Sequence, residues 1–243
     1  MTRVVALEIA VQDAAGARVA FDNGADRVEL CQALSATGGL TPSSGVVDAV
    51  LETAGAGRHV AVLVRPRPGG FVYAAEEIAV VAADIRDIVR RGAGGIVVGA
   101  LREAGGIDRE AIRRWKDAAG TAELVFHRAI DTLNDPLAIV DELVELGADR
   151  VLTSGGATRS IDGVDTLGAL AHGAAGRMQI MAGGGVRVED IDELVAAGVD
   201  AVHLSAKRRS DDVTPSGPGG GDAGYDITDP EIVAAATRAI RGA

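Results

Sequence analysis

The pentapeptide Gly24-Ala25-Asp26-Arg27-Val28 decides the fold, because it returns unchanged as Gly147-Ala148-Asp149-Arg150-Val151. A looser copy is Gly198-Val199-Asp200-Ala201-Val202, and a further variant is Gly92-Ala93-Gly94-Gly95-Ile96. Each copy follows an amphipathic helical stretch and opens a short β-branched run, so its glycine is expected to end a helix and its later residues to begin a strand. One helix-to-strand unit is therefore repeated along the chain.

Eight strand-like runs are separated by helical patterns at about the spacing of one βαβ unit. This alternation ends on a helix expected at Pro230–Ile240 and predicts a single domain, a (β/α)8 barrel of the TIM type. An open doubly wound sheet is the main rival, and it is less favoured because no glycine-rich fingerprint follows the first run. The eight runs are Val4–Ala10, Arg27–Cys31, Val60–Arg65, Gly95–Gly99, Glu123–His127, Arg150–Ser154, Met178–Ala182 and Asp200–Ser205.

Between the runs, two helix starts carry capping signals: Asp135 stands before Pro136, and Thr228–Glu231 has capping-box spacing.

The glycine- and proline-rich loops Ser35–Ser44 and Pro66–Ala75 follow the second and third strands, on the face where barrels bind substrates. A polar, glycine-rich loop around 210–226 is expected to be flexible. It is either a lid or a tolerated insertion.

Composition limits the function classes. The 243 residues are 47% hydrophobic and 2% aromatic, which suits a barrel core of Ala, Val, Leu and Ile. The net charge of −11, without a Lys- or Arg-rich run, argues against a nucleic-acid partner. The single cysteine fits a reducing compartment, and no apolar run approaches the ~20 residues of a membrane span. A soluble cytoplasmic protein without a membrane partner is expected.

Polar side chains cluster at the predicted strand ends. Period-two alternation turns Glu8, Glu29 and His203 toward the barrel interior. Buried charges must be paired or functional, so Arg27 with Glu8 or Glu29 could equally be an ion-pair layer that fixes the barrel. The candidate catalytic residues are Glu8, Glu29, Arg65, His127, Arg128, Asp131 and His203.

These residue types suit acid–base work on a small anionic ligand, with or without a phosphate group, since histidine transfers protons near neutrality and arginine binds carboxylate or phosphate. Our hypothesis is that Arg65 and the loop Gly183–Gly185 hold the anion while His127 and Glu29 exchange protons, oriented by Asp131 or Glu8. Lyase, isomerase or hydrolase chemistry would fit. The loop is the place where many barrels bind phosphate, although the glycines could serve a tight turn alone. The candidate ligand-binding residues are Ser154, Gly183, Gly184, Gly185 and Ser205.

Metal donors are few. Cu(I) prefers thiolate or thioether ligands, and the chain offers Cys31, three methionines and four histidines without a Cys-x-x-Cys motif. Cys31 could join His127 or His203 across the barrel mouth, or it could be a small core residue. His59 and His172 fall at the opposite rim and are expected on the surface.

The chain resembles the CutC family, through LEIAVQD at Leu7–Asp13, NGADRVELC at Asn23–Cys31, GGLTPS at Gly38–Ser43, RPR at Arg65–Arg67, FHRAID at Phe126–Asp131, RVLTSGG at Arg150–Gly156 and MAGGGV at Met181–Val186. The resemblance implies a TIM-type barrel, a cytosolic homodimer or higher homo-oligomer, and a role in copper homeostasis. Residues that match the polar rim of the family are Glu8, Glu29, Cys31, Arg65, His127, Arg128, Asp131, Ser154 and His203.

The chain departs from the family at the metal donors. Ala10 and Val11, Ala61-Val62 and Val72 stand where members often carry cysteines or a His-Pro pair. Two alternatives to an enzyme remain open. One, from the family resemblance, is a non-enzymatic cytosolic Cu(I)-binding protein, and the other is a barrel used as an interaction scaffold with a large apolar patch.

Overall fold

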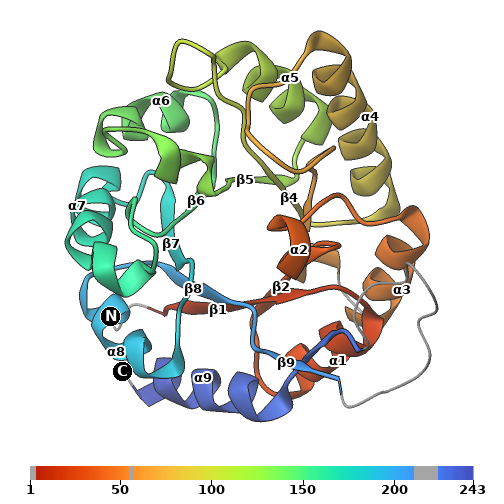
Figure 1. The fold of residues 1–243 in the computed structure, drawn as a ribbon, viewed down its shortest axis with the longest axis vertical. Coiled ribbons are helices and arrows are strands. Elements are labelled where there is room, and N and C mark those ends of the chain that lie inside the picture. Colours follow the sequence, from red (N-terminus) through yellow and green to blue (C-terminus); the bar gives the residue numbers. More distant parts are fainter. Residues whose placement is uncertain (1–3, 55–56, 211–223, 243) are drawn as a thin grey trace.

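A computed structural model of the chain describes residues 4–54, 57–210 and 224–242. Eight parallel strands pair in sequence order, and β8 closes on β1, so the predicted (β/α)8 barrel is confirmed (Figure 1). Each expected run contains a strand, with ends that differ by one or two residues. The strands are β1 Ala6–Val11, β2 Arg27–Leu30, β3 Val60–Leu63, β4 Gly95–Val98, β5 Glu123–Phe126, β6 Arg150–Thr153, β7 Gln179–Gly183 and β8 Ala201–Leu204.

Helices form an outer ring around these strands, and the short helix α2 lies inside that ring, over the barrel (Figure 1). The α-helices are α1 Ala14–Asp22, α2 Leu34–Thr37, α3 Ser44–Ala54, α4 Ala75–Arg91, α5 Arg109–Ala119, α6 Val140–Glu145, α7 Val164–Ala174, α8 Ile191–Ala196 and α9 Pro230–Gly242. Short 3-10 helices are η1 Gly57–His59, η2 Arg128–Thr132, η3 Leu137–Ile139, η4 Ser160–Gly163 and η5 Val188–Asp190.

The repeated pentapeptide has a physical cause. In each full copy the glycine adopts a positive φ, +96° at Gly24 and +76° at Gly147, which ends the preceding turn. The aspartate two residues later accepts a hydrogen bond from the backbone of the preceding strand: Asp26 from the amide of Leu7 and Asp149 from that of Leu124, both at 2.8 Å. Asp200 of the looser copy does the same for Ile180. The motif therefore ties each new strand to its neighbour at the N-terminal end of the barrel.

The two predicted caps differ in outcome. Asp135 accepts hydrogen bonds from the amides of Leu137 and Ala138, as expected for the cap of η3. The capping-box assignment of Thr228–Glu231 is wrong, because Thr228 ends a strand and Asp229 caps α9 through the amides of Glu231 and Ile232. An aspartate directly before an N1 proline outcompetes the threonine.

Apolar packing forms two layers. The larger lies between strands and helices and includes Leu7, Ile9, Trp115 and Phe126. The smaller fills the barrel interior and consists of Cys31, Ala61, Leu63, Val97, Val125, Leu152, Met181 and Ala201. Glu8 is fully buried beside this inner layer, as the alternation predicted.

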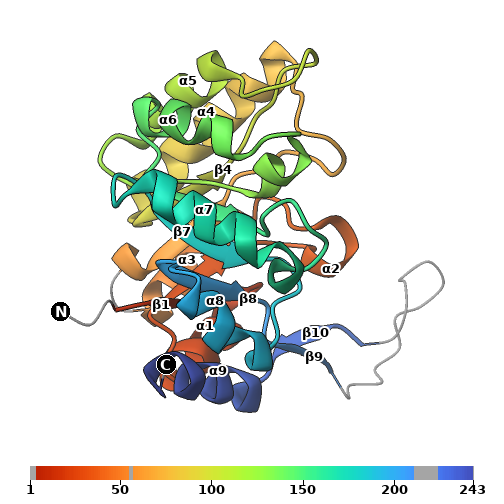
Figure 2. The same ribbon diagram turned by 90° about the vertical axis from the view of Figure 1, so that its left-hand side faces the viewer.

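At the C-terminal end of the barrel lie α2 and a two-stranded sheet of β9 (Lys207–Arg209) and β10 (Asp226–Thr228) (Figure 2). The sheet contacts α2 through Ser35, which hydrogen-bonds Lys207 and Asp226.

Most of the loop expected at 210–226 lies outside the described residues. Of the two remaining histidines, His172 is exposed and His59 is half-buried. Among the described helices, none combines the length and apolarity of a membrane span.

Candidate functional site

A cavity of about 250 Å³ opens at the C-terminal end of the barrel. This is the end at which barrel enzymes bind their substrates. Its walls combine charged groups with apolar side chains from the loops after β2, β3 and β7. The lining residues are Glu29, Leu34, Gly38, Leu63, Arg65, Phe71, His127, Arg128, Leu152, Gly184, Gly185, Val186, His203, Leu204 and Ser205.

Three polar side-chain atoms in this wall are buried and make no hydrogen bond within the described part of the chain: Glu29 Oε2, Arg65 Nε and His127 Nε2. Leaving such an atom unpaired costs about 1–3 kcal/mol, and more when the group is charged. All three were candidate residues, and the fold brings them to one cavity. Their convergence is the strongest sign of a ligand site in the molecule.

Arg65 is 7% exposed and holds two loops together. Its Nη1 donates to the carbonyls of Thr37 and Gly39, and its Nη2 donates to the carbonyl of Gly69. The guanidinium carbon lies 5.1 Å from the centre of the Phe71 ring. No described carboxylate forms an ion pair with Arg65, so its positive charge is buried without a counter-ion and favours an anion in the cavity.

Glu29 supplies the opposite charge. The residue is 5% exposed, and its Oε2 makes no hydrogen bond to any described residue. Burial raises the pKa of this carboxyl to about 7, and the nearby carboxylate of Glu8 adds to the effect, while His203 and Arg27 oppose it. Glu29 is therefore poised to gain or lose a proton near neutral pH, which is the requirement for a general acid or base.

His203 lies beside Glu29 and is oriented by Glu8. Its Nδ1 is 2.8 Å from Glu8 Oε1, a contact set by the register in which β8 places His203 opposite Glu8 on β1. Burial alone would lower the pKa of His203. The hydrogen bond to Glu8 and the negative charges of Glu29 and Glu8 have a larger, opposite effect, so the pKa of His203 is raised. The imidazole next to Glu29 is thus His203, whereas the sequence hypothesis paired Glu29 with His127.

Glu8 belongs to a buried ionic layer that lies below the cavity. Arg27 Nε donates to Glu8 at 2.5 Å, Arg27 Nη2 donates to Glu123 at 2.5 Å, and Arg150 Nε donates to Glu123 at 3.1 Å. Burial alone would raise the pKa of Glu8, but Arg27 and His203 reverse the effect and lower it to about 2. Arg27 does not pair with Glu29. Its contacts fit the structural alternative, an ion-pair layer that fixes neighbouring strands.

His127 is a neutral hydrogen-bond donor. Its Nδ1 accepts the backbone amide of Ala129 at 3.2 Å, which leaves the proton on Nε2. Burial, together with the charge of Arg65, lowers the pKa of His127 to about 4. Gly99 makes room for the ring, since a Cβ at that position would lie 2.5 Å from it. His127 thus carries one N–H, on a buried Nε2 without a partner among the described residues, and its other nitrogen already accepts a hydrogen bond.

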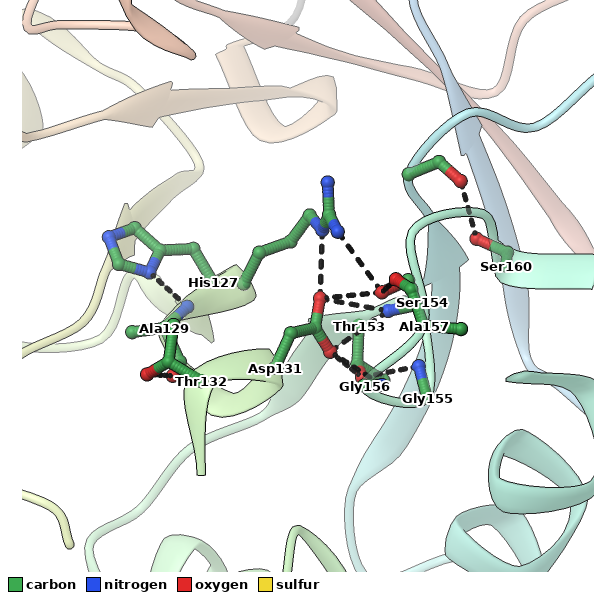
Figure 3. A network of polar contacts seen from close by, with 12 residues as sticks. His127, Ala129, Asp131, Thr132, Thr153, Ser154, Gly155, Gly156, Ala157 and Ser160 are labelled. Atoms are coloured by element: carbon green, nitrogen blue, oxygen red, sulfur yellow. Dashed lines mark hydrogen bonds and ion pairs between the residues drawn. The ribbon is translucent and has the colours of Figure 1, made fainter. Parts of the chain in front are cut away.

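Asp131 and Ser154 form a support behind the cavity wall and do not line the cavity itself. Asp131 accepts hydrogen bonds from Thr153 Oγ1 and from both the amide and the hydroxyl of Ser154 (Figure 3). It also accepts a 2.8 Å hydrogen bond from Arg128 Nε. Asp131 therefore positions Arg128 and does not contact His127, in contrast to the orienting role that the sequence suggested. The hydroxyl of Ser154 is likewise occupied by Asp131 and Ala157.

The glycine-rich loop divides into two parts. Gly184 and Gly185 line the cavity, as does Ser205 after β8. Gly183 does not line it; a Cβ there would lie 2.3 Å from Leu152, so this glycine serves close packing. Sequence reasoning missed Phe71, which contacts both Arg65 and His127, because an aromatic residue inside a long loop carries no pattern.

The soft metal donors of the described residues do not line the cavity, since Cys31 and Met181 lie in the inner apolar layer. Cys31 is fully buried inside the barrel, and its Sγ lies 3.8 Å from the carbonyl of Val11. Burial raises the pKa of the thiol, which disfavours the thiolate that binds Cu(I), and Glu29 adds to the effect. The described residues that could jointly hold an ion are Glu8, Glu29 and His203, a harder set of oxygen and nitrogen donors. These residues do not fit a Cu(I) site.

Comparisons with known proteins fix the family. A sequence model of the CutC family matches residues 5–208. The family protein CutC of Xylella fastidiosa strain Temecula1 is 43% identical over 204 residues, which cover 83% of this chain and 74% of that protein. The chain belongs to the CutC family. A second member, from Xanthomonas campestris pv. campestris strain 8004, is 42% identical over 83% of both chains.

A solved structure supports the same assignment. A candidate copper homeostasis protein CutC from Streptococcus agalactiae is 31% identical and superposes with a TM-score of 0.75, covering 83% of this CutC family member and 98% of that chain. Thiamine phosphate pyrophosphorylase from Pyrococcus furiosus is 13% identical with a TM-score of 0.62, covering 99% of this chain and 97% of that chain. The second likeness reflects the barrel fold alone.

Proposed function

We propose that this CutC family member binds a small anionic ligand in the strand-end cavity and transfers protons to or from it. The observation that carries the proposal is the set of three buried, unpaired atoms: Glu29 Oε2, Arg65 Nε and His127 Nε2. Arg65 brings a positive charge without a counter-ion, and His127 brings a neutral N–H donor. An anion between them would replace the hydrogen bonds that these groups lack.

The proton-transfer step is assigned to Glu29 and His203. The pKa of Glu29 lies near 7, and His203 is held by Glu8 through Nδ1, so its Nε2 is the nitrogen left for the cavity. This division resembles other acid–base sites in which two groups of different pKa take the two roles. Such a pair is compatible with lyase, isomerase or hydrolase reactions on an anionic substrate.

Copper handling is the competing function; the resemblance to the CutC family implied it, and the description of the Streptococcus agalactiae relative names copper homeostasis. The donor set of the described residues argues against a Cu(I) site, because Cys31 is buried inside the barrel and neither it nor a described methionine lines the cavity. Anion binding is therefore the function we propose.

The test is a thermal-shift panel of small carboxylates and phosphates on the purified protein. Arg65→Met should abolish stabilisation by the anions that bind, since it removes the buried charge. Arg67→Met is the matched control: this arginine pairs with Glu77 and does not line the cavity. The proposal fails if no anion stabilises the protein, or if both variants respond as the parent chain does.

A further inference from the structure

The loop Gly184–Val186 presents backbone amides to the cavity. The carbonyl of Gly184 accepts the amide of Ser160 at 2.8 Å and its hydroxyl at 3.1 Å. The carbonyl of Gly185 accepts Arg159 Nε at 3.4 Å. Ser160 and Arg159 do not line the cavity, so both carbonyls point away from it.

The amides that follow these carbonyls must point the opposite way. The structure contains no cis peptide among the described residues, and in a trans peptide the carbonyl and the next N–H are antiparallel. The N–H groups of Gly185 and Val186 therefore face the cavity, and neither donates to another described residue. Two successive amides that face the same cavity can bind one anion between them, and the φ values of +122° at Gly184 and +62° at Gly185 are ones that glycine adopts without strain from a Cβ.

Arg128 completes the cluster of donors. Its Nε and Nη2 are held by Asp131 and Ser154, at 2.8 and 3.0 Å. The guanidinium lies against Gly184, where a Cβ would come within 2.8 Å of its Cζ, so only glycine permits this approach. No hydrogen bond from Nη1 to a described residue is present, and Arg128 lines the cavity.

We infer that Arg128 and the amides of Gly185 and Val186 form a subsite for the phosphate group of a small phosphomonoester. A phosphate offers three acceptor oxygens in a tetrahedral arrangement, which matches one guanidinium and two amides arriving from different directions. The inference rests on the proposed function, because the rest of the ligand then reaches Arg65, His127 and the Glu29–His203 pair. A cavity of about 250 Å³ limits that remainder to a few carbons with hydroxyl, carbonyl or carboxylate groups.

The test is an NMR titration of the full chain with inorganic phosphate, followed by glycerol phosphate and glycerol. Phosphate should shift the amide resonances of Gly185 and Val186 in a saturable manner. Glycerol phosphate should bind at least about tenfold more tightly than phosphate, and glycerol should not bind. Arg128→Met should weaken phosphate binding about tenfold or more, as expected for loss of a charged hydrogen bond, while Arg67→Met should leave it unchanged.

Two results would overturn the subsite. One is phosphate binding that leaves the Gly185 and Val186 amides unshifted. The other is binding of carboxylates or phosphates that Arg65→Met abolishes and Arg128→Met does not alter. The second result would leave anion binding at Arg65 intact, so it separates failure of the phosphate subsite from failure of the proposed function. Amide dispersion in the same spectra tests whether Arg128→Met keeps the native fold, and Arg128→Lys should restore part of the affinity because it keeps the charge.

Discussion

Glu29→Gln should stabilise the folded protein, because the ionised carboxyl of Glu29 is buried and lowers the free energy of unfolding. Its pKa rises from 4.5 to about 7 on folding. A tenfold change in an ionisation constant corresponds to about 1.4 kcal/mol, so an ionised Glu29 costs the folded state about 3 kcal/mol above pH 7. Glutamine keeps the shape of the side chain and removes this cost.

The sign of the pH dependence follows from the direction of the shift. Below pH 4.5 the carboxyl is protonated in both the folded and unfolded states, so the variant and the parent should be equally stable. Between pH 4.5 and 7 the unfolded state releases the proton first, so the cost to the parent chain grows with pH and levels off above 7. The stabilisation by Glu29→Gln should therefore be near zero at pH 4.5 and largest at pH 8.

Urea denaturation of the parent and variant between pH 4.5 and 8 measures this difference. Glu8→Gln is the matched control in the same barrel, with the opposite sign. Burial alone would raise the pKa of Glu8, but Arg27 and His203 lower it from 4.5 to about 2, so its charge contributes about 3 kcal/mol of stability above pH 4.5 that is lost as the pH falls toward 2. The reasoning would be refuted if Glu29→Gln were less stable than the parent at pH 8. It would also be refuted if the difference in unfolding free energy between the two did not change with pH.

Three further predictions concern the cavity and the metal. His127 should remain neutral down to about pH 5 and carry its proton on Nε2, as read from its ¹⁵N shifts; a pKa near 6.5 would contradict the buried environment. Asp131→Asn should reduce phosphate affinity several-fold by releasing Arg128, which the same NMR titration measures, and unchanged affinity would show that Arg128 needs no support. A Cu(I) competition titration should give the same weak binding for the parent chain and Cys31→Ser, whereas a tight one-to-one complex lost in the variant would restore the copper alternative.

The fold could be predicted because its signal is local and repeated. Each copy of the pentapeptide contains the glycine that ends one helix and the aspartate that bonds the backbone of the neighbouring strand. Alternation then placed Glu8, Glu29 and His203 inside the barrel. These features depend on residues a few positions apart, which a single sequence displays directly.

The partners within the site depend on contacts between distant strands. Glu8 meets His203 because β8 closes on β1 in one particular register, and the sequence of either strand does not contain that register. Asp131 turns to the end of β6 instead of toward His127, because Thr153 and Ser154 offer it two hydroxyls and an amide. Glu123 was overlooked for the same reason, since its partners Arg27 and Arg150 lie on β2 and β6.

A high-resolution crystal structure of the protein grown with glycerol phosphate tests the central claim most directly. We expect density for the ligand within hydrogen-bond distance of Glu29 Oε2, Arg65 Nε and His127 Nε2. A structure in which those three atoms bond to one another or to the protein backbone, with the ligand elsewhere, would contradict the site.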